Sequence, residues 1–221
     1  MVKSNVNAGM VYPSKFLKAD MRSSTVAEHS LALRSQLDGG LSIDDVTISQ
    51  GGSLRLTAAA PTGVLVIPIV GSVLLNDEVV LDAGNVYWCP RMDAELNLRN
   101  IQETGTVNCV IMKMRQDGLS RPVSLPQAGK HTVDILSKNS LIQAEGLPSV
   151  HIGVYDSRRK DLVAVQAPDE RFLVYVVNGA FEVDGRLMEY RDALLLWDTA
   201  EVDFEALAEE SILLTIFITN N

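Results

Sequence analysis

The sequence predicts an all-β protein with two antiparallel β-sandwich or jelly-roll barrels in one chain and few short helices. Three observations predict this fold class: many short apolar segments rich in β-branched residues, turn-forming residues between them, and one pattern that occurs twice. The chain has 221 residues, of which 47% are hydrophobic and 21% are charged. Two domains of about 100 residues could therefore each bury a core of their own.

The repeated pattern covers residues 64–88 and residues 172–197. Each copy starts with an almost continuous apolar segment, which is typical of a strand buried on both faces. A glycine ends that segment, and Gly71 of the first copy aligns with Gly179 of the second. We therefore expect the same structural unit to occur twice.

After the glycine, each copy continues with a short strand and a tight turn. The strands are expected at residues 72–75 and 180–183, and the turns at Asn76-Asp77 and Asp184-Gly185. Asp-Gly between two apolar segments is a strong signal for a two-residue hairpin turn, because both turn positions need a positive φ. Each copy is thus expected to contain an antiparallel hairpin.

Outside the repeat, further segments have the length and composition of strands. We expect them at residues 53–59, 107–114, 150–155, 162–166 and 212–219. Partial helical periodicity at residues 25–37 and 133–145 predicts one or two short helices. We expect an N-terminal domain with an N-terminal arm at residues 1–117, a linker at 118–135 and a C-terminal domain at 136–221.

Charge and composition exclude several classes of function. The net charge is −9, and the one compact basic cluster, Arg158-Arg159-Lys160, is too small to neutralise several phosphates, so nucleic-acid binding is not expected. The longest apolar run, residues 64–70, is far shorter than the about 18 residues that span a bilayer, so no membrane association is expected. Residues 1–10 lack the apolar stretch of a secretion signal. We expect a cytoplasmic protein in which Cys89 and Cys109 are reduced core residues.

The spacing of Gly52 and Gly71 resembles the first motif of the cupin superfamily, in which histidines and a glutamate bind a metal ion. In this frame the ligand positions fall on Ala58, Ala60 and Val64, and none of these side chains has an atom that binds metal. The sequence therefore keeps the glycines of the motif but lacks its metal ligands.

A second cupin motif aligns with the segment that starts at Gly84. Pro90 matches its proline, whereas Met92 replaces a glycine, Glu95 replaces the fourth ligand, a histidine, and Arg99 replaces an asparagine. In the barrel that this frame implies, Glu95 points inward. Two interpretations of Glu95 stay open: a pocket carboxylate that orients a ligand or acts as a base, or a side chain turned out to solvent.

Residues 12–219 resemble the pirin-like and quercetinase-like bicupins, most strongly within residues 174–218. In that family the N-terminal cupin normally binds iron or another divalent metal through three histidines and a glutamate, and the C-terminal cupin usually lacks ligands. This chain lacks the ligands in both copies, since the C-terminal copy has Gln166, Pro168 and Phe172 at the first three ligand positions. We therefore expect no metal and no other cofactor.

The pocket-lining candidates are Ala58, Ala60, Val64 and Glu95, and no catalytic residue is predicted. The leading hypothesis is a metal-free, non-enzymatic bicupin whose N-terminal barrel is either filled or binds a small organic molecule. A regulatory role with a protein partner and a homodimer are further expectations. The alternative is an oxidoreductase resembling quercetin 2,3-dioxygenase with a metal site rebuilt from Glu95 and a distant histidine. The histidines, at positions 29, 131 and 151, form no ligand pair and are expected at the surface or in structural hydrogen bonds.

Overall fold

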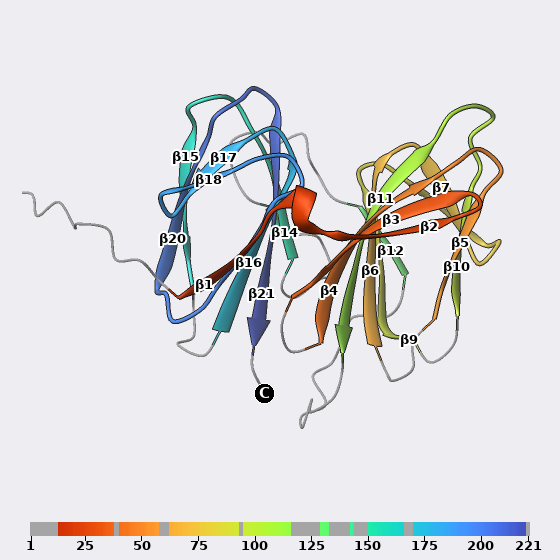
Figure 1. The fold of residues 1–221 in the computed structure, drawn as a ribbon, viewed down its shortest axis with the longest axis horizontal. Helices are drawn as coiled ribbons and strands as arrows, with labels where there is room; N and C mark the ends of the chain where they lie inside the picture. The colour runs from red at the N-terminus through yellow and green to blue at the C-terminus, as the bar shows by residue number, and fades with distance from the viewer. Residues whose placement is uncertain are drawn as a thin grey trace, which may run out of the picture. The chain divides into compact units, whose positions relative to one another are not determined.

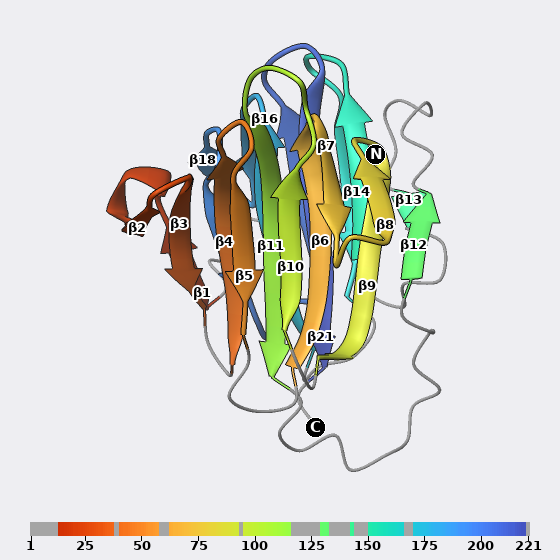
Figure 2. The same ribbon diagram turned by 90° about the vertical axis from the view of Figure 1, so that its right-hand side faces the viewer.

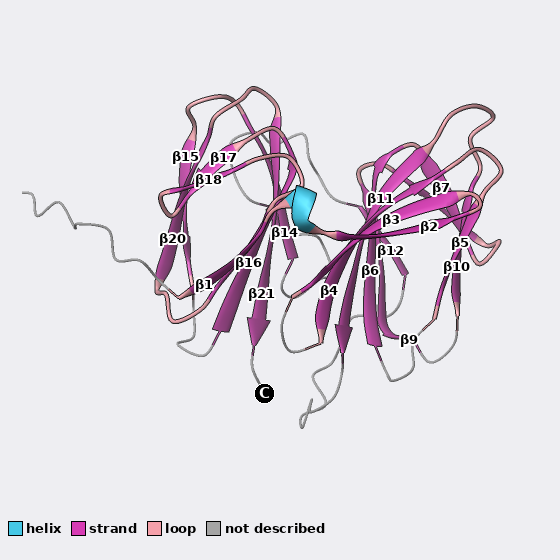
Figure 3. Ribbon diagram, in the orientation of Figure 1, coloured by secondary structure: helices cyan, strands magenta, loops and turns pink. Residues whose placement is uncertain are grey.

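A computed structural model describes residues 13–37, 40–57, 62–92, 95–115, 129–132, 142–143, 150–165 and 170–219. In this part of the chain almost every element is an antiparallel strand, and the single helical element is a short 3-10 turn, η1 (Ala19–Met21) (Figure 1, Figure 3). No helix in the described ranges has the length and apolar character needed to cross a membrane. The all-β prediction is confirmed.

The described residues form two compact units. The N-terminal unit contains the described residues between 20 and 132 together with residues 142–143 and 150–152, and the C-terminal unit contains residues 13–19 and 153–219. Each unit has a larger and a smaller sheet, with a core of buried side chains between them.

The larger sheet of the N-terminal unit can be followed in Figure 2. Its strand order is β12 (Gly129–Thr132), β9 (Asn85–Met92), β6 (Thr62–Val70), β11 (Val107–Arg115), β4 (Leu41–Ile48), β3 (Ser30–Gln36) and β2 (Ser23–Ala27). The smaller sheet has the order β5 (Ser53–Leu56), β10 (Leu96–Asn100), β7 (Ser72–Leu75) and β8 (Val79–Asp82). Val66 and Ile111 of the first sheet pack in one cluster with Leu75 and Leu98 of the second, so the core lies between the sheets.

The C-terminal unit repeats this arrangement. Its larger sheet has the order β1 (Ser14–Leu17), β19 (Ala193–Leu196), β16 (Glu170–Asn178), β21 (Ser211–Thr219), β14 (Val150–Tyr155) and β13 (Ile142–Gln143). Its smaller sheet has the order β15 (Lys160–Ala164), β20 (Glu201–Ala206), β17 (Phe181–Val183) and β18 (Arg186–Met188). Tyr155, Phe181 and Phe204 pack edge-to-face at its centre, with the Tyr155 and Phe204 rings 5.2 Å apart.

The internal repeat extends to details of the backbone. Gly71 and Gly179 both have left-handed φ angles, 78° and 77°, where β6 and β16 end. Just before each glycine, the pairing skips one residue, Ile69 on β6 and Val177 on β16, so the same bulge occurs in both units. The two-residue turns after β7 and β17 have positive φ at both positions, as the sequence predicts.

Two strands cross the predicted domain division. The predicted N-terminal arm contains β1, which pairs with β19 of the C-terminal unit. The predicted linker contains β12, which pairs with β9 of the N-terminal unit. A strand at the edge of a sheet has backbone N–H and C=O groups without hydrogen-bond partners. β1 supplies partners for such groups on β19, and β12 supplies them on β9.

The helix predicted at residues 25–37 is wrong. This segment contains parts of the antiparallel hairpin β2–β3, and β3 pairs with β4 over its whole length. The partial helical periodicity was weak, and pairing with a neighbouring strand outweighs it. Of the second predicted helix, only residues 142–143 are described, and they form β13.

Candidate functional site

The inner face of the larger N-terminal sheet carries a group of charged side chains. We call inner the face turned toward the smaller sheet, where Val46 of β4 and Ile111 of β11 pack in the core. Side chains alternate along a strand, so Asp44 and Lys113 share this face with them. Arg34 of β3 lies directly opposite Asp44 in the register.

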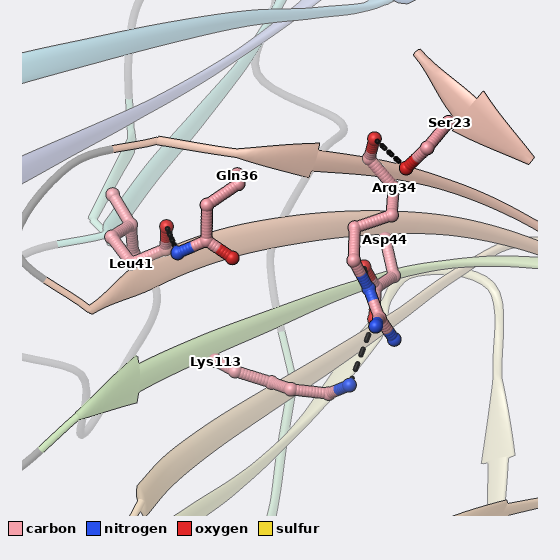
Figure 4. Close-up of polar contacts among 6 residues, drawn as sticks. All are labelled: Ser23, Arg34, Gln36, Leu41, Asp44 and Lys113. Carbon is pink, nitrogen blue, oxygen red and sulfur yellow. Dashed lines mark hydrogen bonds and ion pairs between the residues drawn. The ribbon is translucent and has the colours of Figure 1, made fainter.

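Arg34, Asp44 and Lys113 form one ion-pair cluster, here named the Arg34–Asp44–Lys113 cluster (Figure 4). Arg34 donates from Nε to Asp44 Oδ1 at 2.9 Å and from Nη2 to Oδ2 at 3.1 Å. Lys113 Nζ donates to the same Oδ2 at 2.8 Å. Both carboxylate oxygens of Asp44 are therefore occupied, in the two-pronged geometry that makes arginine–carboxylate pairs strong.

The three side chains of the cluster differ in solvent exposure. The Asp44 side chain is 2% exposed, that of Lys113 18% and that of Arg34 49%. Burial alone raises the pKa of Asp44, but the hydrogen bonds and positive charges of Arg34 and Lys113 outweigh burial and lower the pKa below its usual value. The same interaction raises the pKa of Arg34. Asp44 is thus a charged carboxylate at neutral pH.

We expect the stabilising effect of ionised Asp44 to be present above about pH 4 and to disappear below it. The folded-state pKa of Asp44 is lowered relative to the unfolded value of about 3.9, so its contribution is complete above that value and is lost as the pH falls through the folded-state pKa. The measurement is the unfolding free energy of the wild type and Asp44→Asn in urea at several pH values on either side of about pH 4. The difference between them should shrink in acid, and a constant or growing difference would contradict this.

The register places the cluster beside one of the sequence candidates. Lys113 of β11 lies opposite Val64 of β6, and Val64 lies opposite Cys89 of β9. Val64 is fully buried in the core, and Cys89 is half-buried and packs against the same core. The third ligand position of the first cupin motif is therefore the direct neighbour of a lysine.

The other candidates lie elsewhere. Ala58 and Ala60 fall outside the described residues. The Glu95 side chain, just before β10, is 55% exposed, and its carboxylate lies 3.4 Å from Arg55 Nε. The structure places Glu95 at the surface beside a guanidinium, which is the exposed one of the two interpretations left open by the sequence.

His29 and His151 do not join the cluster. His29 lies in the exposed turn between β2 and β3, close to Glu28. His131 lies on β12, opposite Val86 of β9. His151 lies on β14, where burial lowers its pKa. Within the described ranges, no three His, Cys, Asp or Glu side chains gather as a possible metal-ligand set.

Comparisons with known proteins agree with the fold. The model of the quercetinase C-terminal cupin domain matches residues 154–215. Two crystal structures of YhhW from Escherichia coli superpose with TM-scores of 0.76 and 0.75 at 14% identity. They cover 95% and 94% of this chain and 99% and 100% of their own, and the second is a structure of the bacterial pirin in complex with nickel(II). The chain therefore has a bicupin fold like that of the bacterial pirin.

A third structure, YlbA from Escherichia coli, covers 98% of this chain and 96% of its own, with a TM-score of 0.69 and 13% identity. No curated protein matches the sequence. At these identities the structural likeness establishes the fold, whereas the chemistry depends on the residues of this chain.

In the motif frame, the described residues around the third ligand position do not fit a divalent cation. Val64 has no donor atom, and both oxygens of Asp44 already accept hydrogen bonds from Arg34 and Lys113. A divalent site needs about three converging donors and an open coordination position. Two fixed positive charges beside the position would also repel a metal ion.

In the C-terminal unit, uncharged side chains occupy the positions that correspond to Val64 and Lys113. Phe172 on β16 corresponds to Val64, and Phe217, its partner on β21, corresponds to Lys113. Their rings lie 4.9 Å apart, and they belong to the apolar core of that unit. The charged cluster is therefore not a requirement of the fold, because the repeat is built with an aromatic pair there.

The cluster was not predicted from the sequence. Residues 41–48 were not identified as a strand, although Ile43 and Val46 flank the adjacent Asp44 and Asp45 there. A carboxylate on a buried strand requires a cationic partner, and Lys113 lies in a segment that was predicted to be a strand. That signal could have indicated a buried ion pair, but it could not have shown which strands are neighbours.

Proposed function

We propose that this pirin-like bicupin is a metal-free, non-enzymatic protein that binds a small organic molecule at the inner face of its N-terminal sheet, in a binding or regulatory role. The observation that supports this most directly is Lys113, which is held by Asp44 and lies opposite Val64 at the cupin metal position. An ammonium group held beside that position supplies a positive charge without a bound metal.

The exposure of the cluster indicates where a ligand would lie. Val64 is fully buried, so the ligand binds through the partly exposed side chains around it. Lys113 and Arg34 are partly exposed, and they mark the polar end of the inner face. Ligand sites commonly combine apolar surroundings with a few fixed polar groups, and this end of the sheet offers both.

The test of the metal-free state is elemental analysis of protein purified without a metal-binding tag. We expect far less than one ion of iron, nickel, zinc or copper per chain, and no rise in melting temperature on adding any of them, because a ligand that binds only the folded state raises stability. A stoichiometric metal that survives dialysis would overturn the proposal.

The second candidate is a dioxygenase that acts on flavonols. It is favoured by the match of residues 154–215 to the quercetinase C-terminal cupin domain. The test is oxygen consumption with quercetin after loading with iron, nickel, copper or zinc in turn, for the wild type and Glu95→Gln. We expect no consumption above the protein-free rate, whereas metal-dependent turnover that Glu95→Gln abolishes would establish this candidate.

A further inference from the structure

The charges of the Arg34–Asp44–Lys113 cluster indicate the chemical class of the ligand. We propose that the polar end of the inner face binds a small organic anion, with its carboxylate on Lys113 and Arg34. This inference rests on the proposed function, since it identifies the ligand of the same site. It depends on the charge balance, the free donors and the surroundings of the cluster.

The charge balance of the cluster is positive. It contains two cations, Arg34 and Lys113, and one anion, Asp44, whose two oxygens are both occupied. One positive charge therefore remains without a counter-charge within the cluster. A bound carboxylate would neutralise it, a cationic ligand would be repelled, and a neutral ligand would leave it uncompensated.

Lys113 also has hydrogen-bond donors to spare. An ammonium group has three N–H donors, and the described part of the chain shows one acceptor for them, Asp44 Oδ2. The remaining donors can bind an incoming oxygen. Because Asp44 holds Lys113 in place, little side-chain entropy is lost when a ligand binds.

The neighbouring strands favour an organic anion over a simple inorganic one. On the inner face of β9, Tyr87 and Cys89 are half-buried and pack against the core. Cys89 lies two strands from Lys113, with Val64 between them. A carboxylate bound at Lys113 could therefore place its carbon skeleton toward a partly apolar surface, and burying that skeleton adds affinity that phosphate does not have.

The experiment compares acids with amides of the same skeleton. Benzoate and benzamide, and hexanoate and hexanamide, are titrated at neutral pH and followed by ligand-observed NMR, with inorganic phosphate as a further probe. We expect each acid to bind about tenfold more tightly than its amide, corresponding to one charge-assisted contact, and more tightly than phosphate. Lys113→Met should remove the preference, whereas Lys113→Arg should retain it.

The matched control is Lys130→Met, which removes an exposed lysine of β12 and should leave the preference unchanged. If Lys113→Met does not fold, Arg34→Met replaces it, since the Arg34 side chain is half exposed and its removal should also reduce the preference. Acids and amides that bind equally well would refute the anion inference and leave the proposed function standing. If no organic probe binds at all, the proposed binding function and the anion inference both fail. Phosphate that binds as tightly as the acids would refute the inference that the ligand is an organic anion.

Discussion

Gly179→Ala is expected to destabilise the protein by about 3 kcal/mol. The residue has a φ of 77°, where a side chain costs about 1 kcal/mol or more. A new Cβ would also clash with the Ser211 hydroxyl and lie 2.9 Å from Ser211 Cβ and 3.0 Å from its Cα. Ser211 is fully buried and donates from Oγ to the Ala208 carbonyl at 2.9 Å, so it cannot rotate away without losing that bond. The measurement is urea unfolding.

Two other glycines of the repeat provide controls. Gly185 also has a positive φ, 70°, but nothing lies within 4 Å of its Cβ position, so Gly185→Ala isolates the backbone strain, about 1 kcal/mol. At Gly71 the atom nearest to the Cβ position is Val107 Cγ2 at 3.0 Å. The loss of stability in Gly71→Ala should therefore lie between the losses in Gly185→Ala and Gly179→Ala. If all three substitutions cost the same, the close contact with Ser211 is not what requires glycine at position 179.

Asp44→Asn should destabilise the folded state by about 2 to 3 kcal/mol. The asparagine fits the same space but leaves Arg34 and Lys113 without a counter-charge on a largely buried face. Removing one partner of a fully buried ion pair costs about 3 to 5 kcal/mol, and we expect less here because both cations are partly exposed. The loss is measured as a shift of the urea midpoint at neutral pH.

The matched control for Asp44→Asn is Asp77→Asn. Asp77 forms the same type of pair with Arg99, at 2.9 Å, but both side chains are exposed, and such pairs contribute about 1 kcal/mol or less. Asparagine also tolerates the positive φ of Asp77. Equal losses in the two variants would mean that burial adds nothing to the Asp44 interaction.

The sequence predicted the fold class and much of its detail. The local sequence was sufficient to predict an element wherever the residues of that element alone favour its conformation. The strand of residues 72–75 and the Asp184-Gly185 turn are examples, and both were found as expected. Alignment of Gly71 with Gly179 predicted the repeat, because both positions need a left-handed backbone. The absence of metal ligands in the cupin frame was predicted from residue identity alone, and it stays a prediction.

The candidate site could not be predicted in the same way. Arg34, Asp44 and Lys113 lie on three strands that are neighbours only through pairing between distant segments. Arg34 lies in a segment predicted to be a helix, and Asp44 lies in one with no predicted element. Glu95, which the motif frame pointed inward, forms its ion pair with Arg55 at the surface.

By itself, the sequence determined two all-β units with a preserved glycine frame, because the backbone geometry of a glycine belongs to the individual residue. Only the tertiary structure decided that β1 and β12 join sheets across the expected division, and that Lys113 lies beside Val64 with Asp44 as its partner. Register and strand order arise from long-range pairing and burial, and a shift of one residue would turn these charges to the opposite face.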